Sequence, residues 1–409
     1  MIWDLITIGG GAAGFFGAIT HAEELGCGGS TLILERSSQV LGKVRISGGG
    51  RCNVTHACFD PREFSSHYPR GEKALIGPLH RWNAADTVAW FEAKGVELKT
   101  EADGRMFPTS NDSQTIVHCL TDAAQAAGIT VRTQCAVAGI TQTNDKSAFV
   151  LEVGRGETLQ ARRVLLATGG TRLAAGARLA EQLGHVLAPA VPSLFTFKIT
   201  DPRLQGLQGL SVERVACRIE DRKLRACGPL LITHWGVSGP GILRLSAWGA
   251  RELAAMDYHF TLRVNWLPDR EDLAGEWQRL RRSWGKRQMH ARCPFDALPK
   301  RLWVRLLASV GIAEAQTWSQ LSKDQSRALT ASLTDAAFQV NGKSTNKDEF
   351  VTCGGVSLKD IDLKTMQSRL CPGLYFAGEV MDVDGITGGF NFQNAWTSGH
   401  HAGIAIANG

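Results

Sequence analysis

A guanidinium, a thiol and an amide follow one another directly after three glycines, in the segment Ser47-Gly-Gly-Gly-Arg-Cys-Asn53. Three successive glycines destabilise the interior of a helix or strand, because glycine loses the most backbone freedom on folding. We therefore expect residues 41–55 to form a backbone loop that lies against a ligand, rather than a flexible surface loop. Within this loop, Cys52 carries a thiol that can exchange a proton.

A second glycine pattern stands near the N-terminus. An apolar run, Asp4–Ile8, leads into Gly9-x-Gly11-x-x-Gly14, and a second run, Thr31–Glu35, ends on an acid. In a nucleotide-binding βαβ unit the first glycine allows a tight turn, the second lets the backbone approach a pyrophosphate, and the third lets the helix pack on the strand. The helix N-terminus faces the phosphates and the acid holds a ribose hydroxyl. The pattern predicts a dinucleotide site and leaves NAD and FAD as alternatives.

Two more glycine turns follow buried strands later in the chain. One strand runs into Ala167-Thr-Gly-Gly170, and another ends in Gly378-Glu379. A further glycine turn, Val383–Asn391, leads into a helix predicted over Gln393–Asn408. A helix N-terminus preceded by glycines favours anions, and an acid before it suits the hydroxyl groups of a polyol.

Local periodicity predicts the elements around these turns. Helices are expected over Ala84–Gly95 and Ser113–Ala127, and strands over Ile129–Ile140 and Ala148–Val153. After about residue 190, short strands separated by turns predict a small antiparallel barrel or sandwich. These strands are Phe195–Thr200, Val212–Ile219, Leu230–Thr233 and His259–Val264. The pattern is helical again from Glu271 to about Leu333.

Length and composition define the class of protein. With 409 residues the chain is too long for one ordinary core, so two or three domains are expected. Its 44% hydrophobic and 21% charged residues are typical of a soluble globular protein, and no uncharged apolar stretch of about 18 residues predicts a membrane span. The segment Met1–Asp4 has no basic region before the first strand, which argues against a signal peptide and for a cytoplasmic protein.

The cysteines show no metal-binding spacing. Ten of them are scattered along the chain without a Cys-x-x-Cys pair. This argues against a zinc site, an iron–sulfur cluster and a dithiol redox motif, so no metal is expected. Most of the cysteines are predicted to be reduced core residues.

The formal net charge of +6 is unevenly distributed. Positions 279–305 hold nine Lys and Arg residues and one acid, Asp296. This charge suits RNA phosphates, and a solvated helix face is the alternative. The candidate RNA contacts are Arg279, Arg281, Arg282, Lys286 and Arg287. Trp277 and Trp284 are expected to belong to the core rather than to a base-stacking platform.

Together these motifs resemble the BaiN/RdsA family of FAD flavoproteins over essentially the whole chain. The most specific matches are Ser47–Asn53 and the block from Gly378-Glu379 to Gly388-Gly-Phe-Asn391. The other matches are Gly9–Gly14, Ala167–Gly170, Gly104-Arg-Met-Phe-Pro108, Thr233-His-Trp-Gly-Val-Ser-Gly-Pro240 and Val351-Thr-Cys-Gly-Gly-Val356. The resemblance implies an α/β fold with a discontinuous, two-dinucleotide-type Rossmann-like FAD domain (1–190 and 347–409). An antiparallel β-barrel (191–268) and a small helical subdomain (269–346) would be inserted in it.

The resemblance also implies which residues hold FAD. Gly9–Gly14 would bind the pyrophosphate, Glu35 the adenosine ribose, and the Val137 backbone the adenine. Glu379 would hold the ribityl chain, and Gly388–Asn391 with the following helix would stabilise negative charge at flavin N1 and O2. The Gly48–Asn53 loop would lie near flavin N5. The full set is Gly9, Gly11, Ala12, Ala13, Gly14, Glu35, Arg36, Lys43, Ser47, Gly48, Gly49, Gly50, Arg51, Asn53, Val137, Ala167, Thr168, Gly169, Gly170, Gly378, Glu379, Gly388, Gly389, Phe390 and Asn391.

Members of this family have been linked to dihydrouridine synthesis in ribosomal RNA, to reduction of unsaturated 3-oxo bile acids and to amine oxidation. In the first two reactions, hydride from reduced flavin adds to a carbon–carbon double bond conjugated to a carbonyl, and an acid protonates the other carbon. The resemblance therefore implies an FAD-dependent oxidoreductase, with uridine in 23S rRNA as the best candidate substrate and a small enone or amine as the alternative. Since no second Gly-x-Gly-x-x-Gly follows a strand, NADPH or NADH would dock transiently in the same cleft as electron donor.

The catalytic residues are less well defined than the cofactor residues. Cys52 is the candidate proton donor, and packing beneath the flavin is an equal alternative. Asn391 and His234 are weaker candidates. Between Gly170 and Leu179 the chain is shorter than is usual in the family, so contacts made by that segment to substrate or nicotinamide are not carried over.

Three other functions fit parts of the pattern. A nicotinamide-dependent dehydrogenase without flavin would use the same N-terminal glycines. A folate- or flavin-dependent RNA methyltransferase would have a related fold, but the catalytic cysteine motifs of those enzymes are absent from this sequence. A flavin-bound RNA or ribosome-associated factor without catalysis would need only the cofactor site and the basic segment.

Overall fold

The computed structural model describes residues 1–154, 156–170, 175–344 and 351–409. The chain divides into two compact units, one formed by Met1–Pro192 with Lys347–Gly409 and the other by Ser193–Asn346. The first unit is discontinuous because the second is inserted into it. Within the segment expected to be shorter than is usual in the resembled family, residues 171–174 lie outside the described residues.

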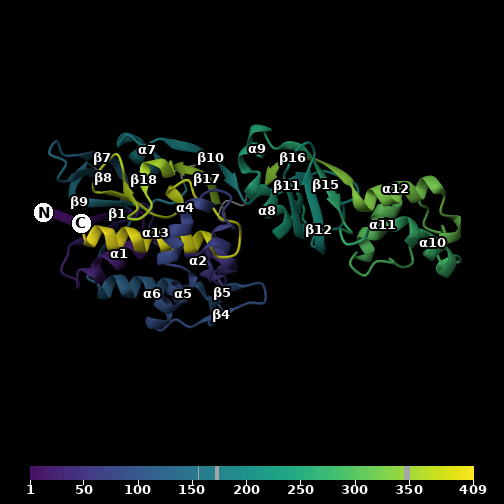
Figure 1. The fold of residues 1–409 in the computed structure, drawn as a ribbon, viewed down its shortest axis with the longest axis horizontal. Helices are drawn as coiled ribbons and strands as arrows, with labels where there is room; N and C mark the ends of the chain where they lie inside the picture. Colours follow the sequence, from purple (N-terminus) through teal and green to yellow (C-terminus); the bar gives the residue numbers. More distant parts are fainter. Residues whose placement is uncertain (155, 171–174, 345–350) are drawn as a thin grey trace. The chain divides into compact units, whose positions relative to one another are not determined.

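A largely parallel sheet forms the centre of the first unit (Figure 1). Its strands follow the order β18-β19-β20-β9-β1-β2-β6, and β8 joins β7 to β9. The strands from β20 to β6 in this order are parallel, and the apolar runs predicted for β1 and β2 are buried. The strands wholly or largely in this unit are β1 (Ile2–Ile8), β2 (Thr31–Leu34), β3 (Thr55–His56), β4 (Leu98–Thr100), β5 (Arg105–Pro108), β6 (Thr130–Arg132), β7 (Val137–Gln142), β8 (Phe149–Val153), β9 (Glu157–Leu166), β10 (Leu187–Ser193), β17 (Val351–Val356), β18 (Ile361–Asp362), β19 (Gln367–Ser368) and β20 (Leu374–Phe376).

Glycines bring two helices of this unit, α1 (Ala12–Glu24) and α13 (Phe390–Ala407), into backbone contact. A Cβ atom added at Gly399 would lie 2.8 Å from the carbonyl oxygen of Ala13, and one at Gly403 would lie 2.6 Å from that of Gly17. Because contacts advance in the same direction along both chains, the helices run parallel and their N-termini lie at the same end. Figure 1 shows α1 and α13 side by side.

The other helices of the first unit agree with the sequence except at the glycine loop. The predicted helices are confirmed as α5 (Ala84–Ala93) and α6 (Ser113–Ala126). Where a loop is predicted, a helix α2 (Gly42–Gly50) begins, but the backbone leaves the helical conformation from Ser47 to Gly49. The low helix propensity of glycine accounts for this interruption. The remaining helices are α3 (Pro61–Ser65), α4 (Glu72–Arg81) and α7 (Ala175–Gln182), with 3₁₀ segments at Leu358–Asp360 and Gly378–Val380.

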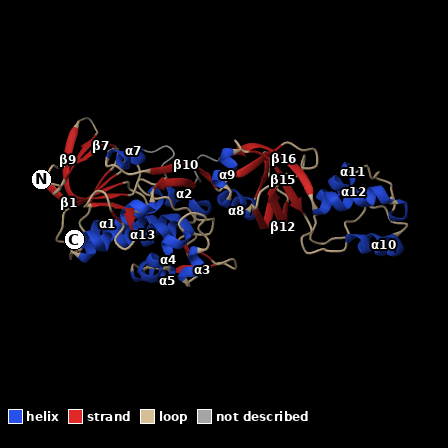
Figure 2. Ribbon diagram, turned by 45° about the horizontal axis from the view of Figure 1, so that its top comes forward, coloured by secondary structure: helices blue, strands red, loops and turns tan. Residues whose placement is uncertain are grey.

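The second unit contains a closed antiparallel barrel, so the choice between barrel and sandwich is resolved (Figure 2). Its strands are β11 (Thr196–Ile199), β14 (Gly236–Ser238), β13 (Arg225–Ile232), β12 (Ser211–Ile219), β15 (His259–Asn265) and β16 (Ala336–Ser344), in that order around the barrel. Two helices, α8 (Pro240–Trp248) and α9 (Ala250–Ala255), stand between β14 and β15 in the chain. β16 pairs with both β11 and β15, although it falls in the stretch expected to be helical subdomain (269–346).

Between β15 and β16, three helices pack around a tryptophan core. They are α10 (Leu273–Trp284), α11 (Lys300–Ser309) and α12 (Lys323–Thr334). Trp277, Trp303 and Trp318 are at most 2% exposed, and the ring of Trp318 stacks on the other two at centroid distances of 6.0 and 6.1 Å. The prediction that Trp277 belongs to the core is confirmed, and the predicted α/β class with an inserted barrel and helical part is confirmed with it.

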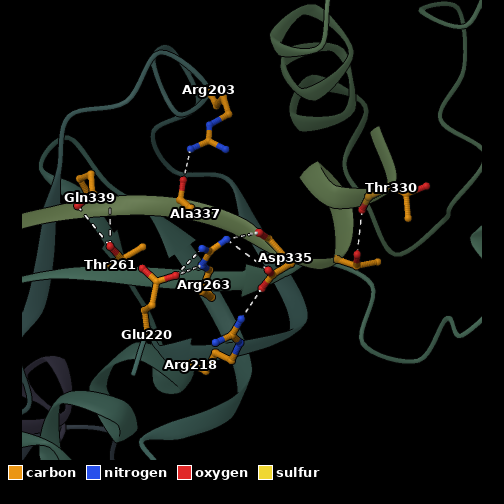
Figure 3. A network of polar contacts seen from close by, with 10 residues as sticks. Arg203, Arg218, Glu220, Thr261, Arg263, Thr330, Asp335, Ala337 and Gln339 are labelled. Carbon is orange, nitrogen blue, oxygen red and sulfur yellow. Dashed lines mark hydrogen bonds and ion pairs between the residues drawn. The ribbon is translucent and has the colours of Figure 1, made fainter. Parts of the chain in front are cut away.

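A polar network ties this helical part to the barrel (Figure 3). At the junction between α12 and β16, Asp335 accepts hydrogen bonds from Arg218 at 2.9 Å and from Arg263 at 3.3 Å. At the other junction, the backbone N–H of Trp266 donates to the carbonyl of Leu333 at 2.8 Å. The start of the helical insertion is therefore bonded to its end, and that end is held by the barrel strands β12 and β15.

The described residues contain neither a membrane-spanning helix nor a cluster of metal ligands. Among them, no helix combines the length and the apolar character that crossing a membrane requires. The same residues hold no group of three or more His, Cys, Asp or Glu side chains placed to bind a metal. The cysteines of the described residues are not assigned to any disulfide bond.

Candidate cofactor site

The glycine turn after β1 contains contacts that only glycine permits. Gly9 has a φ of +114°, and a Cβ atom there would lie 2.3 Å from the carbonyl oxygen of Ala167. A Cβ atom at Gly14 would lie 2.0 Å from the carbonyl oxygen of Gly9. At Gly11, by contrast, a Cβ atom would meet no described atom within 4 Å. A side chain therefore has no room at Gly9 and Gly14, where the turn packs against the protein. The space beside Gly11 is open, and a pyrophosphate is expected to approach there.

The open side of this turn is the N-terminus of α1. Gly11 is the N-cap residue, and no side chain in the described part of the chain caps the helix there. The amides of Ala12 and Ala13 have no intrahelical carbonyl to bind, and the helix dipole places partial positive charge at this end. The geometry is therefore suited to an anionic group.

Glu35 lies against the same turn. Its two carboxylate oxygens accept hydrogen bonds from the N–H groups of Gly10 and Ser37, each at 2.8 Å. The N–H of Cys135 binds the carbonyl of Glu35 at 2.8 Å, which brings the start of β7, with the buried Val137, to this end of the site. The residues expected at the ribose and adenine thus lie close together.

Four segments of the chain meet at Glu379, which follows β20. Its carboxylate pairs with Nζ of Lys43 at 2.5 Å and accepts the backbone N–H of Thr352 at 2.7 Å. A Cβ atom at Gly170, in the turn after β9, would lie 2.8 Å from Oε1 of Glu379. A carboxylate is therefore held where α2, β17 and the turns after β9 and β20 converge.

The Ser47–Asn53 loop has an open glycine face. Its three glycines all have positive φ, and Cβ atoms added to the second and third would meet no described atom within 4 Å. Arg51 is engaged within the protein: its guanidinium lies 4.0 Å from the ring centre of Phe107 and donates to Glu101 at 2.6 Å. The loop therefore offers backbone, rather than a free cation, to a ligand.

This loop is locked to the start of α13. The amide of Asn53, oriented to satisfy its neighbours, accepts the N–H of Gly389 at 3.0 Å. The indole N–H of Trp396 donates to the carbonyl of Val54 at 2.9 Å. A Cβ atom at Gly389 would lie 2.5 Å from the backbone of Thr55. The Ser47–Asn53 loop and the start of α13 are far apart in sequence, but these contacts hold them against one another.

Cys52 belongs to the protein core. Its side chain is fully buried in a cluster that includes Val44, Val54 and Trp396. Burial raises the pKa of the thiol to about 12. Of the two alternatives for Cys52, the structure favours packing beneath the loop over proton donation.

The other two catalytic candidates lie in different places. Asn391 uses both ends of its amide within the turn before α13, accepting the N–H of Gly385 at 2.8 Å and donating to its carbonyl at 2.9 Å. Asn391 therefore acts as a positioning residue for the glycine turn. His234 is an exposed residue of the second unit, between β13 and β14.

Two histidines outside the predicted set stack on Phe390. The rings of His67 and His56 have centroids 4.3 and 4.8 Å from that of Phe390. His56 Nδ1 lies 3.0 Å from the carbonyl oxygen of Gly388, so Nδ1 carries the proton and Nε2 is the acceptor of the neutral ring. Burial lowers the pKa of His56. Its place three residues after Asn53 is the one sequence signal that could have indicated it.

A buried ion pair anchors the same turn. Asp384 is fully buried, and the side chain of its partner Arg70 is 10% exposed. Nε of Arg70 donates to the Asp384 carboxylate at 2.5 Å, and a second contact joins Nη2 to the other oxygen. The backbone N–H of Asp384 also binds the carbonyl of Arg70 at 3.3 Å. This pair fixes the chain immediately before Gly385.

Two buried oxygens complete the test of fit for a dinucleotide cofactor. Thr168 Oγ1 and Asn394 Oδ1 are buried and have no hydrogen-bond partner within the described residues. They lie in the turn after β9 and in the first turns of α13. Four further buried polar atoms of the described residues, in Thr7, Trp266, Trp318 and Ser332, also lack a partner, so this feature is not confined to the site. At Thr168 and Asn394, a bound ligand would supply the partner. With the open glycines and the uncapped α1, they fit the residue set implied for FAD.

Arg36 and the five predicted RNA contacts are exposed. Arg36 follows Glu35 at the surface. The predicted RNA contacts Arg279, Arg281, Arg282, Lys286 and Arg287 are exposed on and just after α10 in the second unit.

Comparisons with known proteins agree with this geometry. A family model described as the HI0933-like protein Rossmann domain matches residues 3–405. The ribosomal RNA dihydrouridine synthase of Escherichia coli (strain K12) is 32% identical over 406 residues, covering 97% of this chain and 96% of that protein. The 3-dehydro-bile acid delta(4,6)-reductase of Clostridium scindens is 27% identical over 416 residues, covering 98% of each.

A solved structure shares the fold at lower identity. The 3-ketosteroid-delta4-(5alpha)-dehydrogenase from Rhodococcus jostii RHA1 superimposes with a TM-score of 0.52 at 14% identity, covering 99% of this chain and 96% of that chain. The resemblance expected from the motifs is confirmed over nearly the whole length by the family match and the curated relatives. The chain belongs to the HI0933-like Rossmann family, the BaiN/RdsA family that its motifs resemble.

Proposed function

We propose that this protein is an FAD-dependent oxidoreductase that reduces a carbon–carbon double bond conjugated to a carbonyl. The observation that carries the proposal is the convergence of the glycine turns at the carboxyl ends of β1, β9 and β20, where open α/β sheets bind ligands. When bound, FAD would supply hydride transfer at its N5 position.

The chain's own residues would hold the cofactor from end to end. The N-terminus of α1 would receive the pyrophosphate, and Glu35 would accept hydrogen bonds from ribose hydroxyls. Glu379, held by Lys43, would bind the ribityl hydroxyls. The N-terminus of α13, which no described side chain caps, would stabilise negative charge on the pyrimidine ring.

Uridine in 23S rRNA is the proposed substrate. Its C5–C6 double bond is conjugated to the C4 carbonyl, so hydride would add at C6 and a proton at C5. Support comes from the relative named as a ribosomal RNA dihydrouridine synthase and from the unbalanced basic charge on the second unit. A small enone is the second candidate, favoured by the relative named as a bile-acid reductase. NADPH or NADH is the proposed electron donor.

Mapping dihydrouridine in 23S rRNA from cells with and without the gene tests the substrate. We expect a dihydrouridine that is lost on deletion, restored by the wild-type gene, and restored less fully by a Gly11→Ala copy, whose affinity for FAD should be about 100-fold lower. An unchanged map would remove uridine as the substrate. Oxidation of the reduced enzyme by an enone would then favour the small-molecule candidate, whereas oxidation by neither would favour a factor without catalysis.

Cys52→Ala tests the packing role of this residue. We expect the rate of double-bond reduction to stay within about tenfold of the wild type, since a general acid contributes about 10²–10⁴-fold. The buried sulfur is lost, so the fold should be destabilised by about 1 kcal/mol. Single-turnover oxidation of the reduced flavin and thermal unfolding measure the two effects. A rate loss above 100-fold in a protein of unchanged melting temperature would restore Cys52 as the proton donor.

A further inference from the structure

The surface of α10 carries cations that no carboxylate balances. Arg282, Lys286, Arg287 and Arg292, on α10 and the loop after it, are all exposed. None of these four forms an ion pair with any described residue. Because one acid accompanies nine cations between positions 279 and 305, the excess charge is not neutralised locally. These four residues are called the α10 basic face.

Two arginines of the predicted set are engaged within the protein. Arg279 pairs with Glu276 at 2.5 Å, one turn earlier in α10. The guanidinium of Arg281 donates to the carbonyl of Leu321. The structure thus removes these two from the group of available cations and adds Arg292, which the sequence pattern did not single out.

A tryptophan restricts two side chains of this face. The guanidinium groups of Arg287 and Arg292 lie 5.4 and 5.5 Å from the ring centre of Trp284. Trp284 is itself held by an edge-on contact with the buried Trp318, at a centroid distance of 6.3 Å. Cation–π contact to a fixed ring restricts two long side chains before any partner arrives, which lowers the entropy cost of binding.

The basic face stands on a rigid support. On the opposite side of α10, Leu273, Trp277 and Leu280 are buried in the helical core. The contacts of Asp335 with Arg218 and Arg263 fix that core to the barrel (Figure 3). Arg282 therefore stands on a fixed helix, and the loop that carries the other three cations is held by the N–H of Trp318, which donates to the carbonyl of Arg287 at 3.1 Å.

We propose that the α10 basic face binds the phosphate backbone of folded RNA. Arg and Lys groups that neutralise phosphates supply sequence-independent affinity, and the planar guanidinium matches a phosphate with two hydrogen bonds. A membrane surface is disfavoured, because segments that bind membranes combine basic with apolar residues. Among the described residues, no large hydrophobic side chain is exposed between positions 270 and 310. The inference rests on the proposed function and names the surface that would hold its RNA substrate.

The test is a salt titration of binding to an unmodified 23S rRNA transcript. The holoenzyme is compared with a variant carrying Arg282→Gln, Lys286→Gln, Arg287→Gln and Arg292→Gln. A control removes four exposed cations elsewhere in the same unit, through Arg222→Gln, Lys223→Gln, Lys323→Gln and Arg327→Gln. Since each phosphate contact adds about 0.7–0.9 to the slope of log affinity against log salt, we expect the basic-face variant to lose about 3 in slope. The control should keep the wild-type slope.

Two further measurements separate the possible failures. Flavin content and the rate of flavin reduction by NADPH should be unchanged in both variants, and replacing the three arginines by lysine should retain most of the binding. Equal loss of affinity in the basic-face and control variants would overturn the proposal. So would loss of binding to phosphatidylserine vesicles without loss of binding to RNA. If the cellular dihydrouridine map is unchanged on deletion but the basic-face variant alone loses RNA binding, the proposed reaction fails and the RNA surface stands.

Discussion

Replacing Gly14 by alanine is expected to give a protein that retains no flavin and unfolds at a markedly lower temperature. The added methyl group would lie 2.0 Å from the carbonyl oxygen of Gly9 and 3.1 Å from Cγ2 of Thr7. Neither the turn nor the first turn of α1 can keep its place with such an overlap. Overpacking of this kind costs up to about 3 kcal/mol. Flavin absorbance of the purified protein and its thermal unfolding measure both effects.

Gly11→Ala is the matched variant, because it separates packing from cofactor approach. Gly11 has a φ of −93°, which alanine adopts readily, and its Cβ would meet no described atom within 4 Å. The melting temperature of the apoprotein should therefore match that of the wild type. The affinity for FAD should fall by about 100-fold, since the methyl group would stand where the backbone approaches the pyrophosphate. Wild-type flavin affinity in this variant would show that the turn is not the phosphate site.

Breaking the ion pair between Arg70 and Asp384 is expected to have the largest effect on stability. Arg70→Leu takes the guanidinium away from a fully buried carboxylate, which costs about 3–5 kcal/mol. The turn that leads into α13 should also lose its shape, so flavin binding should weaken with stability. Urea unfolding of the apoprotein gives the change in stability, and flavin titration gives the change in affinity.

Two controls make this result specific. The double variant Arg70→Leu/Asp384→Leu should recover much of the lost stability, because it removes the buried charge together with its partner. Asp269→Ala breaks a pair with Arg214 whose side chains are both 64% exposed, and it should cost no more than about 1 kcal/mol. A double variant no more stable than Arg70→Leu would show that the pair acts through packing rather than charge.

Local patterns in the sequence predict much of the fold. The turn from β1 into α1 depends on glycines at fixed spacing, and the contact that requires glycine at Gly14 is with Gly9, only five residues earlier. Amphipathic spacing predicts the helices α5 and α6. The burial of Trp277 follows from its place among the apolar residues on one side of α10. The acids Glu35 and Glu379 stand at strand ends that parallel pairing brings to one edge of the sheet.

What could not be predicted depends on contacts between distant segments. Closure of the barrel by β16 pairs Ile199 with Val340, and no local pattern distinguishes that strand from the end of a helical region. The direction of Cys52 is set by its left-handed backbone, with φ of +61°, at the end of the glycine loop. The sequence suggests Asn391 as a catalytic residue, but both ends of its amide form hydrogen bonds with the backbone of Gly385. His56 gains its place from stacking on Phe390 and from the carbonyl of Gly388.

The parallel contact between α1 and α13 has a consequence for synthesis of the chain. The barrel and its helices use only residues that follow one another between 193 and 346, so this unit can fold as soon as it leaves the ribosome. The helix beside the first glycine turn must instead wait for Gly399 and Gly403, which are made almost 400 residues later. During most of translation, the apolar face of α1 lacks its final neighbour. We therefore expect the inserted unit to reach its native fold before the cofactor domain, because α1 gains its neighbour only after Gly403 has been made.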